Sequence, residues 1–135
     1  MVIRYIESDF SHSLVLIFFS QDGRLHVSWF RLKDDISAEM SAADLVVSHA
    51  GAGSCTEALR AGRRLVIVVN ERLMNDHQSE LADRLHQLGH GLTCRPRTLA
   101  QTLISASNFE AVAWPPAETS RFFTFLESFV GFTQR

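Results

Sequence analysis

The stretch that decides the fold runs from Ala43 to Glu57 and reads Ala-Asp-Leu-Val-Val-Ser-His-Ala-Gly-Ala-Gly-Ser-Cys-Thr-Glu. Its first part, Asp44–Ser48, is rich in valine and is typical of a strand that is buried on both faces. Gly51 and Gly53 then permit positive φ angles and a close approach of the backbone to another group. A helix is predicted to follow this turn. The order of strand, glycine turn and helix is typical of a parallel α/β unit.

The predicted helix begins at Ser54, three residues before Glu57. Its first amide N–H groups point out of the turn at the positive end of the helix, where an anion is favoured. Simpler explanations stay open: Ser54 and Glu57 form a capping box, the glycines make only a tight turn, and His49 bonds only locally. The dinucleotide fingerprint is not met, because Thr56 stands where its third glycine is required.

The composition is that of one ordinary globular domain. The chain has 135 residues, of which 46% are hydrophobic and 21% charged, and its formal charge is -2. A basic surface is expected of a nucleic-acid-binding protein, so nothing here indicates such a partner. Cys55 and Cys94 lack metal-ligand spacing, and we expect reduced thiols in a cytosolic protein, with Cys55 buried in a helix. Leu14–Phe19 is too short to span a bilayer.

Turn signals and apolar spacing predict the remaining elements. Asp22-Gly23 favours a hairpin between two strands, Leu14–Phe19 and Leu25–Phe30. Gly62 is expected to end the central helix near Ala61. The other predicted strands are Leu65–Val69 and Gly91–Cys94, and two further helices are predicted at Asp34–Ala42 and, as the final element, at Glu118–Val130. Between them, one predicted helix has Leu81, Leu85 and Leu88 on its buried face. Another has Thr98 and Gln101 as its capping box and Leu99, Leu103 and Ile104 as its apolar face.

Strands that alternate with helices indicate a parallel sheet with helices on both faces. In such sheets ligands bind beyond the carboxyl ends of the strands, where two predicted loops lie, His49–Ser54 and Asn70–Gln78. The second loop holds Asn75, His77 and Gln78; alternatively Asn75 only caps the next helix and His77 is a solvated first-turn residue. Because the loops follow neighbouring strands, they can converge on one nucleotide-type ligand.

The final predicted helix carries an apolar arc that is too wide for a helix with one exposed face. Its members are Phe122, Phe123, Phe125, Leu126, Phe129 and Val130. Such a helix is either packed deeply in the core or docked on a partner, since monomers seldom expose large apolar patches. Both explanations stay open from the residues alone.

Two long motifs resemble a known glycosyltransferase family. The first is Ala43–Ser54 with Glu57, and the second is Leu65-Val-Ile-Val-Val-Asn-Glu71 followed by Met74-Asn-Asp-His-Gln-Ser-Glu-Leu-Ala82. In order and spacing they resemble the donor-binding catalytic subunits of the UDP-N-acetylglucosaminyltransferase that acts second in dolichol-linked oligosaccharide assembly. More loosely, they are similar to the C-terminal nucleotide-sugar half of the bacterial lipid II glycosyltransferase, a glycosyltransferase family 28 C-terminal domain.

This resemblance implies a fold and a reaction. The fold is a Rossmann-like parallel sheet with helices on both faces, the C-terminal donor half of a GT-B glycosyltransferase. The chain would bind UDP-GlcNAc, while a membrane-anchored partner would bind the lipid-linked acceptor and dock on the C-terminal helix. The two chains would add the second GlcNAc to GlcNAc-diphospho-dolichol at the cytosolic face of the endoplasmic reticulum.

The resemblance also assigns roles to residues. The implied substrate-binding set is Gly51, Ala52, Gly53, Ser54, Glu57, Asn75, His77 and Gln78. The amides of residues 51–54 would bind the UDP diphosphate, Glu57 would accept from the ribose hydroxyls, and His77 and Gln78 would face the donor sugar. His49 is the one candidate catalytic residue, placed to reach the donor phosphates or the acceptor but not assigned as the base. Since no Asp-x-Asp pair is present, neither a metal nor another cofactor is expected.

The N-terminal segment departs from the family. The family opens with a strand and a Thr-Val-Gly-Thr-Thr loop, and nothing in Met1–Leu25 resembles that loop. We therefore expect the first strand and loop to be altered or missing, with residues 1–26 as an atypical segment and residues 27–135 as the nucleotide-sugar-binding domain. A missing strand would leave backbone groups unpaired. The alternative function is a non-catalytic variant that keeps the fold and the partner interface without turnover.

Overall fold

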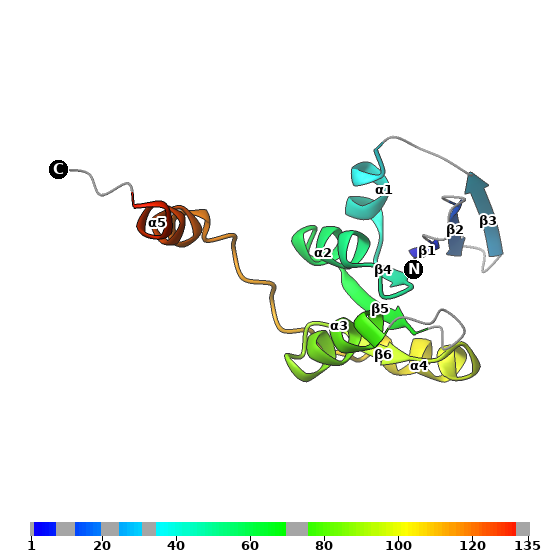
Figure 1. Cartoon of the computed structure of the whole chain (residues 1–135). Helices are drawn as coiled ribbons and strands as arrows, with labels where there is room; N and C mark the ends of the chain where they lie inside the picture. Colours follow the sequence, from blue (N-terminus) through cyan, green and yellow to red (C-terminus); the bar gives the residue numbers. More distant parts are fainter. Residues whose placement is uncertain (1, 8–12, 20–24, 31–34, 70–75, 132–135) are drawn as a thin grey trace.

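A six-stranded sheet organises the structure, which is a computed structural model of the chain (Figure 1). The structure describes residues 2–7, 13–19, 25–30, 35–69 and 76–131. Along the sheet the strand order is β3-β2-β1-β4-β5-β6. The strands are β1 (Val2–Glu7), β2 (Ser13–Phe19), β3 (Leu25–Phe30), β4 (Leu45–Ser48), β5 (Arg64–Val68) and β6 (Leu92–Cys94).

The sheet has a parallel part and an antiparallel part. Strands β1, β4, β5 and β6 run parallel, whereas β2 pairs antiparallel with both β1 and β3. The predicted hairpin of two strands is confirmed, although its turn at Asp22-Gly23 lies outside the described residues. The predicted parallel core is confirmed as well, and it places the carboxyl ends of β4 and β5 at the same edge.

Strand β1 has no counterpart in the sequence-based prediction. A six-residue segment is too short for a periodic signal, although its Val, Ile and Tyr residues favour extended structure. In the structure β1 pairs in parallel with β4, with Ile3 opposite Leu45 and Ile6 opposite Ser48. The backbone groups on that side of β4 are thereby paired, so the unpaired edge expected from a missing strand does not occur at β4. The domain boundary at residue 26 stays a prediction.

Helices cover both faces of the parallel strands. Within the described residues they are α1 (Ser37–Ala42), α2 (Ala52–Arg60), α3 (Asp76–Gln87), α4 (Leu99–Ala106) and α5 (Thr119–Val130), with a 3-10 turn at Pro96–Thr98 before α4. Helices α1, α2 and α3 share one apolar cluster with the sheet, and α4 packs in a second cluster on the opposite face. Helices on both faces, as predicted, are confirmed.

The period of two along a strand explains why β4 and β5 are apolar throughout. Val46 and Ile67 face the cluster of α1, α2 and α3, while Val47 and Val66 face the cluster of α4. All four side chains are buried. The strand at the centre of the deciding stretch is thus buried on both faces, as its composition predicts.

Three details of the predicted helices are wrong. Leu88 and Ile104 were expected on buried faces, but they are 42% and 67% exposed, because small residues, Ala82 and Ala106, occupy the close contacts with the sheet. Thr98 does not cap α4 with its side chain. Its hydroxyl instead accepts from the Arg95 amide at 3.2 Å, within the 3-10 turn.

The segment from residue 107 to residue 118, which we call the strap, follows α4, and its central residues contact the residues that follow α3. The Val112 amide donates to the Gly89 carbonyl at 2.8 Å, and the Val112 carbonyl lies 2.9 Å from His90 Nδ1. Trp114 meets the His90 ring edge-on with centroids 5.0 Å apart and packs on the first apolar cluster. Pro115 and Pro116 then lead away from the sheet toward α5 (Figure 1).

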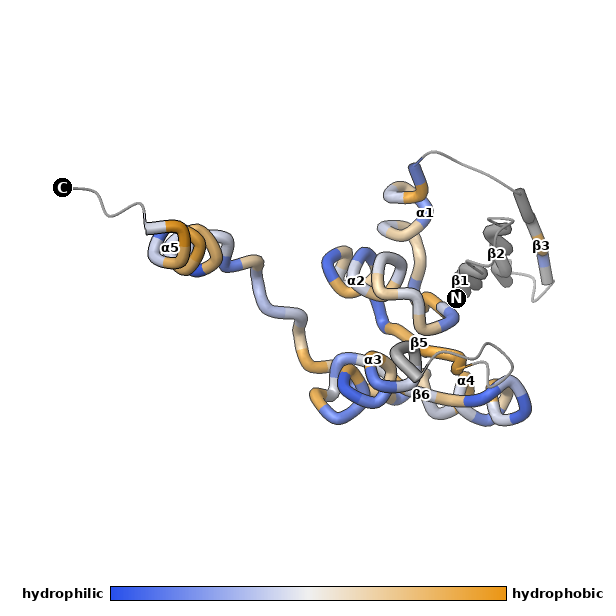
Figure 2. Tube along the Cα trace, in the orientation of Figure 1, coloured by the Kyte–Doolittle hydropathy of each residue, from blue (hydrophilic) through white to orange (hydrophobic). Residues whose placement is uncertain are grey.

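Helix α5 stands apart from the sheet and the other helices (Figures 1 and 2). The predicted helix is confirmed, but none of its residues is buried. The apolar arc is exposed throughout, from 40% at Leu126 to 78% at Phe129. Of the two explanations that the residues left open, burial in the core of this chain is therefore wrong. No described helix is long and apolar enough to cross a membrane.

Gly89 supports a stability prediction. Its φ is +75°, and a Cβ there would lie 2.9 Å from Cγ2 of Val112, so an alanine combines left-handed strain with an overlap against the strap. We expect Gly89→Ala to lower the free energy of unfolding by about 2–4 kcal/mol, as measured by urea denaturation. Gly62, with φ +68° and open space around its Cβ, is the matched control, and Gly62→Ala should cost only about 1–2 kcal/mol. Equal losses in the two variants would contradict the overlap.

Candidate functional site

The amino end of α2 lies directly beyond the carboxyl end of β4. Helix α2 begins at Ala52 with Gly51 as its N-cap, two residues earlier than the sequence predicts. No side chain caps this end, so the capping box of Ser54 and Glu57, one of the explanations that the sequence left open, is wrong. The Cys55 amide donates to the Gly51 carbonyl at 3.0 Å, which closes the first turn.

The first three amides of α2, from Ala52, Gly53 and Ser54, precede that bond and have no helical acceptor. In the part of the chain that the structure describes, none of them donates to another residue. They lie at the positive end of the helix dipole, which carries about half an elementary charge. This end of the sheet therefore offers preformed donors to an anion.

Neither glycine of this turn has a positive φ angle, so the feature of Gly53 that matters here is the absence of a side chain. Gly51 has φ -75°, and the positive φ that the sequence assigned to the glycines falls on Ala50, at +22°. A Cβ built on Gly53 meets nothing within 4 Å. Gly53 therefore lies at the open surface of the helix end, where a bound group can approach the backbone closely.

His49 and Glu57 differ in how much of each side chain is exposed to solvent. His49 follows β4 directly and is buried, with 6% of its surface exposed. Glu57 lies one turn into α2 and is exposed. Because Glu57 forms no capping bond, its carboxylate is available to an external donor.

Cys55 is a buried structural residue of this turn, as predicted. Burial raises the pKa of its thiol from 9.0 to about 11, partly opposed by the hydrogen bond from its Sγ to Ser48 Oγ at 4.0 Å. Burial also raises the pKa of the Cys94 thiol. A thiol is a nucleophile only as the thiolate, so neither cysteine is activated.

The Cys55 pKa predicts how stability depends on pH. Below pH 9 the thiol is protonated in both states and contributes no pH dependence; above pH 9 it ionises first in the unfolded chain, which favours unfolding. Between pH 9 and 11 this single group should cost roughly 2–3 kcal/mol of stability. Urea unfolding at pH 8 and pH 10.5 measures the loss. Cys55→Ala should show a smaller loss over the same interval, and an identical loss would contradict the assignment.

The second predicted loop lies mostly outside the described residues, and so does Asn75. Helix α3 begins at Asp76, so His77 and Gln78 belong to its first turn. Since β4 and β5 are parallel neighbours, the first turns of α2 and α3 follow strands that end at the same edge of the sheet. The described parts of the two motifs that meet at one edge are thus the start of α2 and the carboxyl end of β5. It does not test the roles of the individual site residues.

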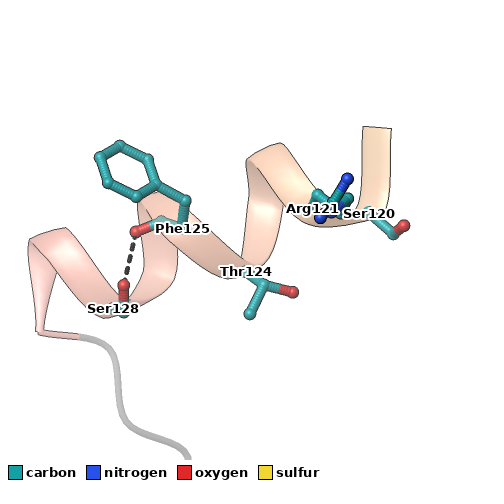
Figure 3. Close-up of a pocket in the computed structure, with 5 residues that line it drawn as sticks. All are labelled: Ser120, Arg121, Thr124, Phe125 and Ser128. Carbon is teal, nitrogen blue, oxygen red and sulfur yellow. Dashed lines mark hydrogen bonds between the residues drawn. The ribbon is translucent and has the colours of Figure 1, made fainter. Parts of the chain in front are cut away.

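Hollows occur elsewhere on the described surface. One, of about 400 Å³, lies along α5 alone and is lined by Ser120, Arg121, Thr124, Phe125 and Ser128 (Figure 3). Because one helix forms it, it is an open surface groove and not a closed cavity. Another, at the amino ends of the strands, is lined in part by Arg60, Arg63 and Arg64, for which the sequence analysis gave no role. Three arginines within five residues are the sequence feature that could have indicated a basic site here. No group of three potential metal ligands occurs among the described residues.

Comparisons with known proteins agree with this geometry. The glycosyltransferase family 28 C-terminal domain matches residues 7–124. The chain is 55% identical over 71 residues to the UDP-N-acetylglucosamine transferase subunit ALG13 of Mus musculus, covering 53% of this chain and 6% of that protein. It is 46% identical over 70 residues to the protein of that name from Yarrowia lipolytica, covering 52% of this chain and 36% of that protein.

A solved structure resembles this chain as well. The solution structure of ALG13 matches with a TM-score of 0.55 and 28% identity, over 83% of this chain and 57% of that one. The chain thus spans between 6% and 57% of the length of the relatives named here. The predicted resemblance and Rossmann-like fold are confirmed. With 118 of its residues matched, the chain belongs to the glycosyltransferase family 28 C-terminal domain family.

Proposed function

We propose that this chain is the donor-binding subunit of a UDP-GlcNAc-dependent glycosyltransferase. The observation that carries the proposal is the uncapped first turn of α2, where three amides and the open face of Gly53 point to an anionic ligand. The names of the relatives, UDP-N-acetylglucosamine transferase subunits, support UDP-GlcNAc as that ligand.

The diphosphate of UDP binds at the amino end of α2. The amides of Gly51, Ala52, Gly53 and Ser54 donate to its oxygens, and the helix dipole stabilises the charge that develops as UDP departs. These donors are fixed in place by the helix before the ligand arrives, so little reorganisation accompanies the reaction. The proposed reaction uses no metal ion or further cofactor.

The remaining site residues surround the nucleoside and the sugar. Glu57 accepts hydrogen bonds from the ribose hydroxyls. His77 and Gln78 bind the donor sugar from the first turn of α3. Asn75 is a further substrate-binding residue of this proposal. His49 lies between the turn and the strand, within the candidate site, and is the candidate to act on the donor phosphates or the acceptor.

A second, membrane-anchored subunit supplies the acceptor side. Two observations support it: the relatives are named subunits, and in the part of the chain that the structure describes no residue of α5 is buried. The partner covers that arc and holds this chain at the cytosolic face of the endoplasmic reticulum. The reaction is transfer of a second GlcNAc to GlcNAc-diphospho-dolichol.

Calorimetric titration with UDP-GlcNAc tests this function, with UDP-glucose and NAD as comparators. Selective binding of UDP-GlcNAc is the expected result. If a folded chain binds no UDP-GlcNAc even in the presence of the partner subunit, the donor function is contradicted. If the chain binds UDP-GlcNAc but the complex transfers no sugar to a lipid-linked acceptor, the non-catalytic alternative, favoured by the altered N-terminal segment, is correct.

Glu57→Ala separates the ribose role from a structural role. Since Glu57 is exposed and caps nothing, we expect the melting temperature to stay within about 2 °C, while affinity for UDP-GlcNAc falls roughly 10-fold with the loss of charge-assisted hydrogen bonds. Glu80→Ala, an exposed carboxylate later in α3, is the matched control and should change neither quantity. Unchanged affinity in Glu57→Ala would remove Glu57 from the site.

A further inference from the structure

A basic groove lies at the opposite edge of the sheet from the donor site. It has a volume of about 440 Å³ and is formed by the carboxyl end of α2, the start of β5 and the strap. Helix α2 has nine residues and separates the two ends by about 13 Å at 1.5 Å per residue. The groove is therefore not part of the donor site.

Three arginines line this groove, and no ion pair with a carboxylate is recorded for them among the described residues. Arg63 donates to the carbonyls of Ala61 at 2.8 Å and Ala43 at 3.2 Å. Arg64 donates to the carbonyls of Asp44, Ala106 and Ser107 at 3.0–3.3 Å. Arg60 is exposed, and no hydrogen bond or ion pair ties it to another of the described residues.

The backbone carbonyls that Arg63 and Arg64 contact do not neutralise the positive charge of the groove. The carbonyls that Arg63 and Arg64 contact lie at or near the carboxyl ends of α1, α2 and α4, each of which carries about half a negative charge. These partial charges sum to about one and a half, which is less than the three positive charges of the arginines, and the carboxylates of Asp44 and Glu110 lie outside the groove lining. Among the described residues that line the groove, none is acidic. The groove also retains N–H donors, since a guanidinium has five.

The other wall of the groove is apolar and fixed. The strap lines it with Phe109, Val112 and Trp114, and His90, which also lines the groove, meets the Trp114 ring edge-on. The backbone bonds of Val112 to Gly89 and His90 hold this wall in place. An apolar wall opposite arginine donors matches a ligand with an anionic head and an apolar or aromatic body.

We propose that this groove binds a phosphate monoester whose phosphate contacts Arg60, Arg63 and Arg64 and whose apolar body lies against Trp114. Arginine suits a phosphate because its planar fork can donate two parallel hydrogen bonds. The same chemistry is present in a free phosphate ester and in the headgroup of an acidic phospholipid, and the experiment separates these sources.

Trp114 provides a local readout. The chain has two tryptophans, so Trp29→Phe leaves Trp114 as the sole tryptophan, which is excited selectively at wavelengths beyond the tyrosine absorption band. Titration of this variant with phenyl phosphate should give a saturable change in emission, at least 10-fold tighter than with inorganic phosphate or with phenol. Phenol binding as tightly as phenyl phosphate, or no saturable change with phenyl phosphate, would overturn the proposal.

Arg60→Gln tests the charge without disturbing the fold, because Arg60 makes none of the carbonyl contacts of its neighbours. We expect the affinity for phenyl phosphate to fall about 5- to 10-fold. Arg97→Gln, an exposed arginine outside the groove, is the matched control and should leave the affinity unchanged. Equal effects of the two substitutions would show general charge attraction and overturn the site. Vesicles with phosphatidic acid then identify the source: a Trp114 response lost in Arg60→Gln indicates the lipid, and its absence beside phenyl phosphate binding indicates the free ester.

Discussion

Gly53→Asp is expected to lower the affinity for UDP-GlcNAc on the order of 100-fold while the chain stays as stable as before, or becomes more stable. Gly53 is the second residue of α2, and a Cβ at this position meets no other atom within 4 Å. An aspartate in the first turn also interacts favourably with the helix dipole, by about 0.3–1 kcal/mol. The folded chain should therefore accept the substitution.

Ligand binding changes in the opposite direction because the new carboxylate occupies the space proposed for the diphosphate. Two like charges about 5 Å apart at an effective dielectric constant near 40 repel by roughly 1.7 kcal/mol. With two charges on the diphosphate the loss is about 3 kcal/mol, which corresponds to the expected 100-fold change. Calorimetry measures the affinity, and thermal denaturation measures the stability.

Two controls separate charge from bulk in this experiment. Gly53→Asn has the shape of the aspartate without its charge and should lose no more than about 10-fold in affinity. Asp83→Asn changes a charge on an exposed site of α3 far along the helix from its first turn, and should leave the affinity unchanged. If Gly53→Asp binds UDP-GlcNAc as the original chain does, the diphosphate does not lie at the amino end of α2.

The double substitution Phe125→Asp with Phe129→Asp should abolish association with the proposed partner subunit and leave the folding of this chain intact. These two rings stack with centroids 6.0 Å apart, and they are 61% and 78% exposed. Since no residue of α5 is buried, their loss should change the free energy of unfolding by no more than about 0.5 kcal/mol. An aromatic residue at the centre of an interface typically contributes about 2 kcal/mol or more.

The expected loss for the two rings is therefore about 4 kcal/mol, or roughly 1,000-fold in affinity. Co-purification of the coexpressed subunits, followed by titration of the isolated proteins, measures it. Arg121→Gln is the control on the same helix, because Arg121 lies outside the apolar arc, pairs with Glu118 at the exposed surface (3.0 Å) and should change affinity little. A complex that survives the double substitution would place the partner elsewhere. A large loss of stability would show that α5 packs on its own chain.

Local sequence determined the elements whose signals are contained within a few residues. The valine run of β4, the left-handed Gly62 after α2 and the hairpin of β2 and β3 were all predictable, because a buried parallel strand, a helix end and an Asp-Gly turn each have a local cause. The order of strands and helices predicted that the carboxyl ends of β4 and β5 lie at the same edge of the sheet. The resemblance to the glycosyltransferase family was recognisable because each of its two motifs is a short stretch of sequence.

The tertiary structure decided whatever depends on a partner distant in the chain. Val2–Glu7 is a strand because β4 offers it an edge, and periodicity over six residues cannot reveal that edge. Leu88 and Ile104 are exposed because alanines of the same helices fit closer to the sheet. The start of α2 at Ala52, two residues before the predicted capping box, leaves the amides of the candidate site uncapped. The phenylalanines of α5 show the principle most clearly: their spacing determined an apolar face, but only the path of the strap determined that this chain does not bury it.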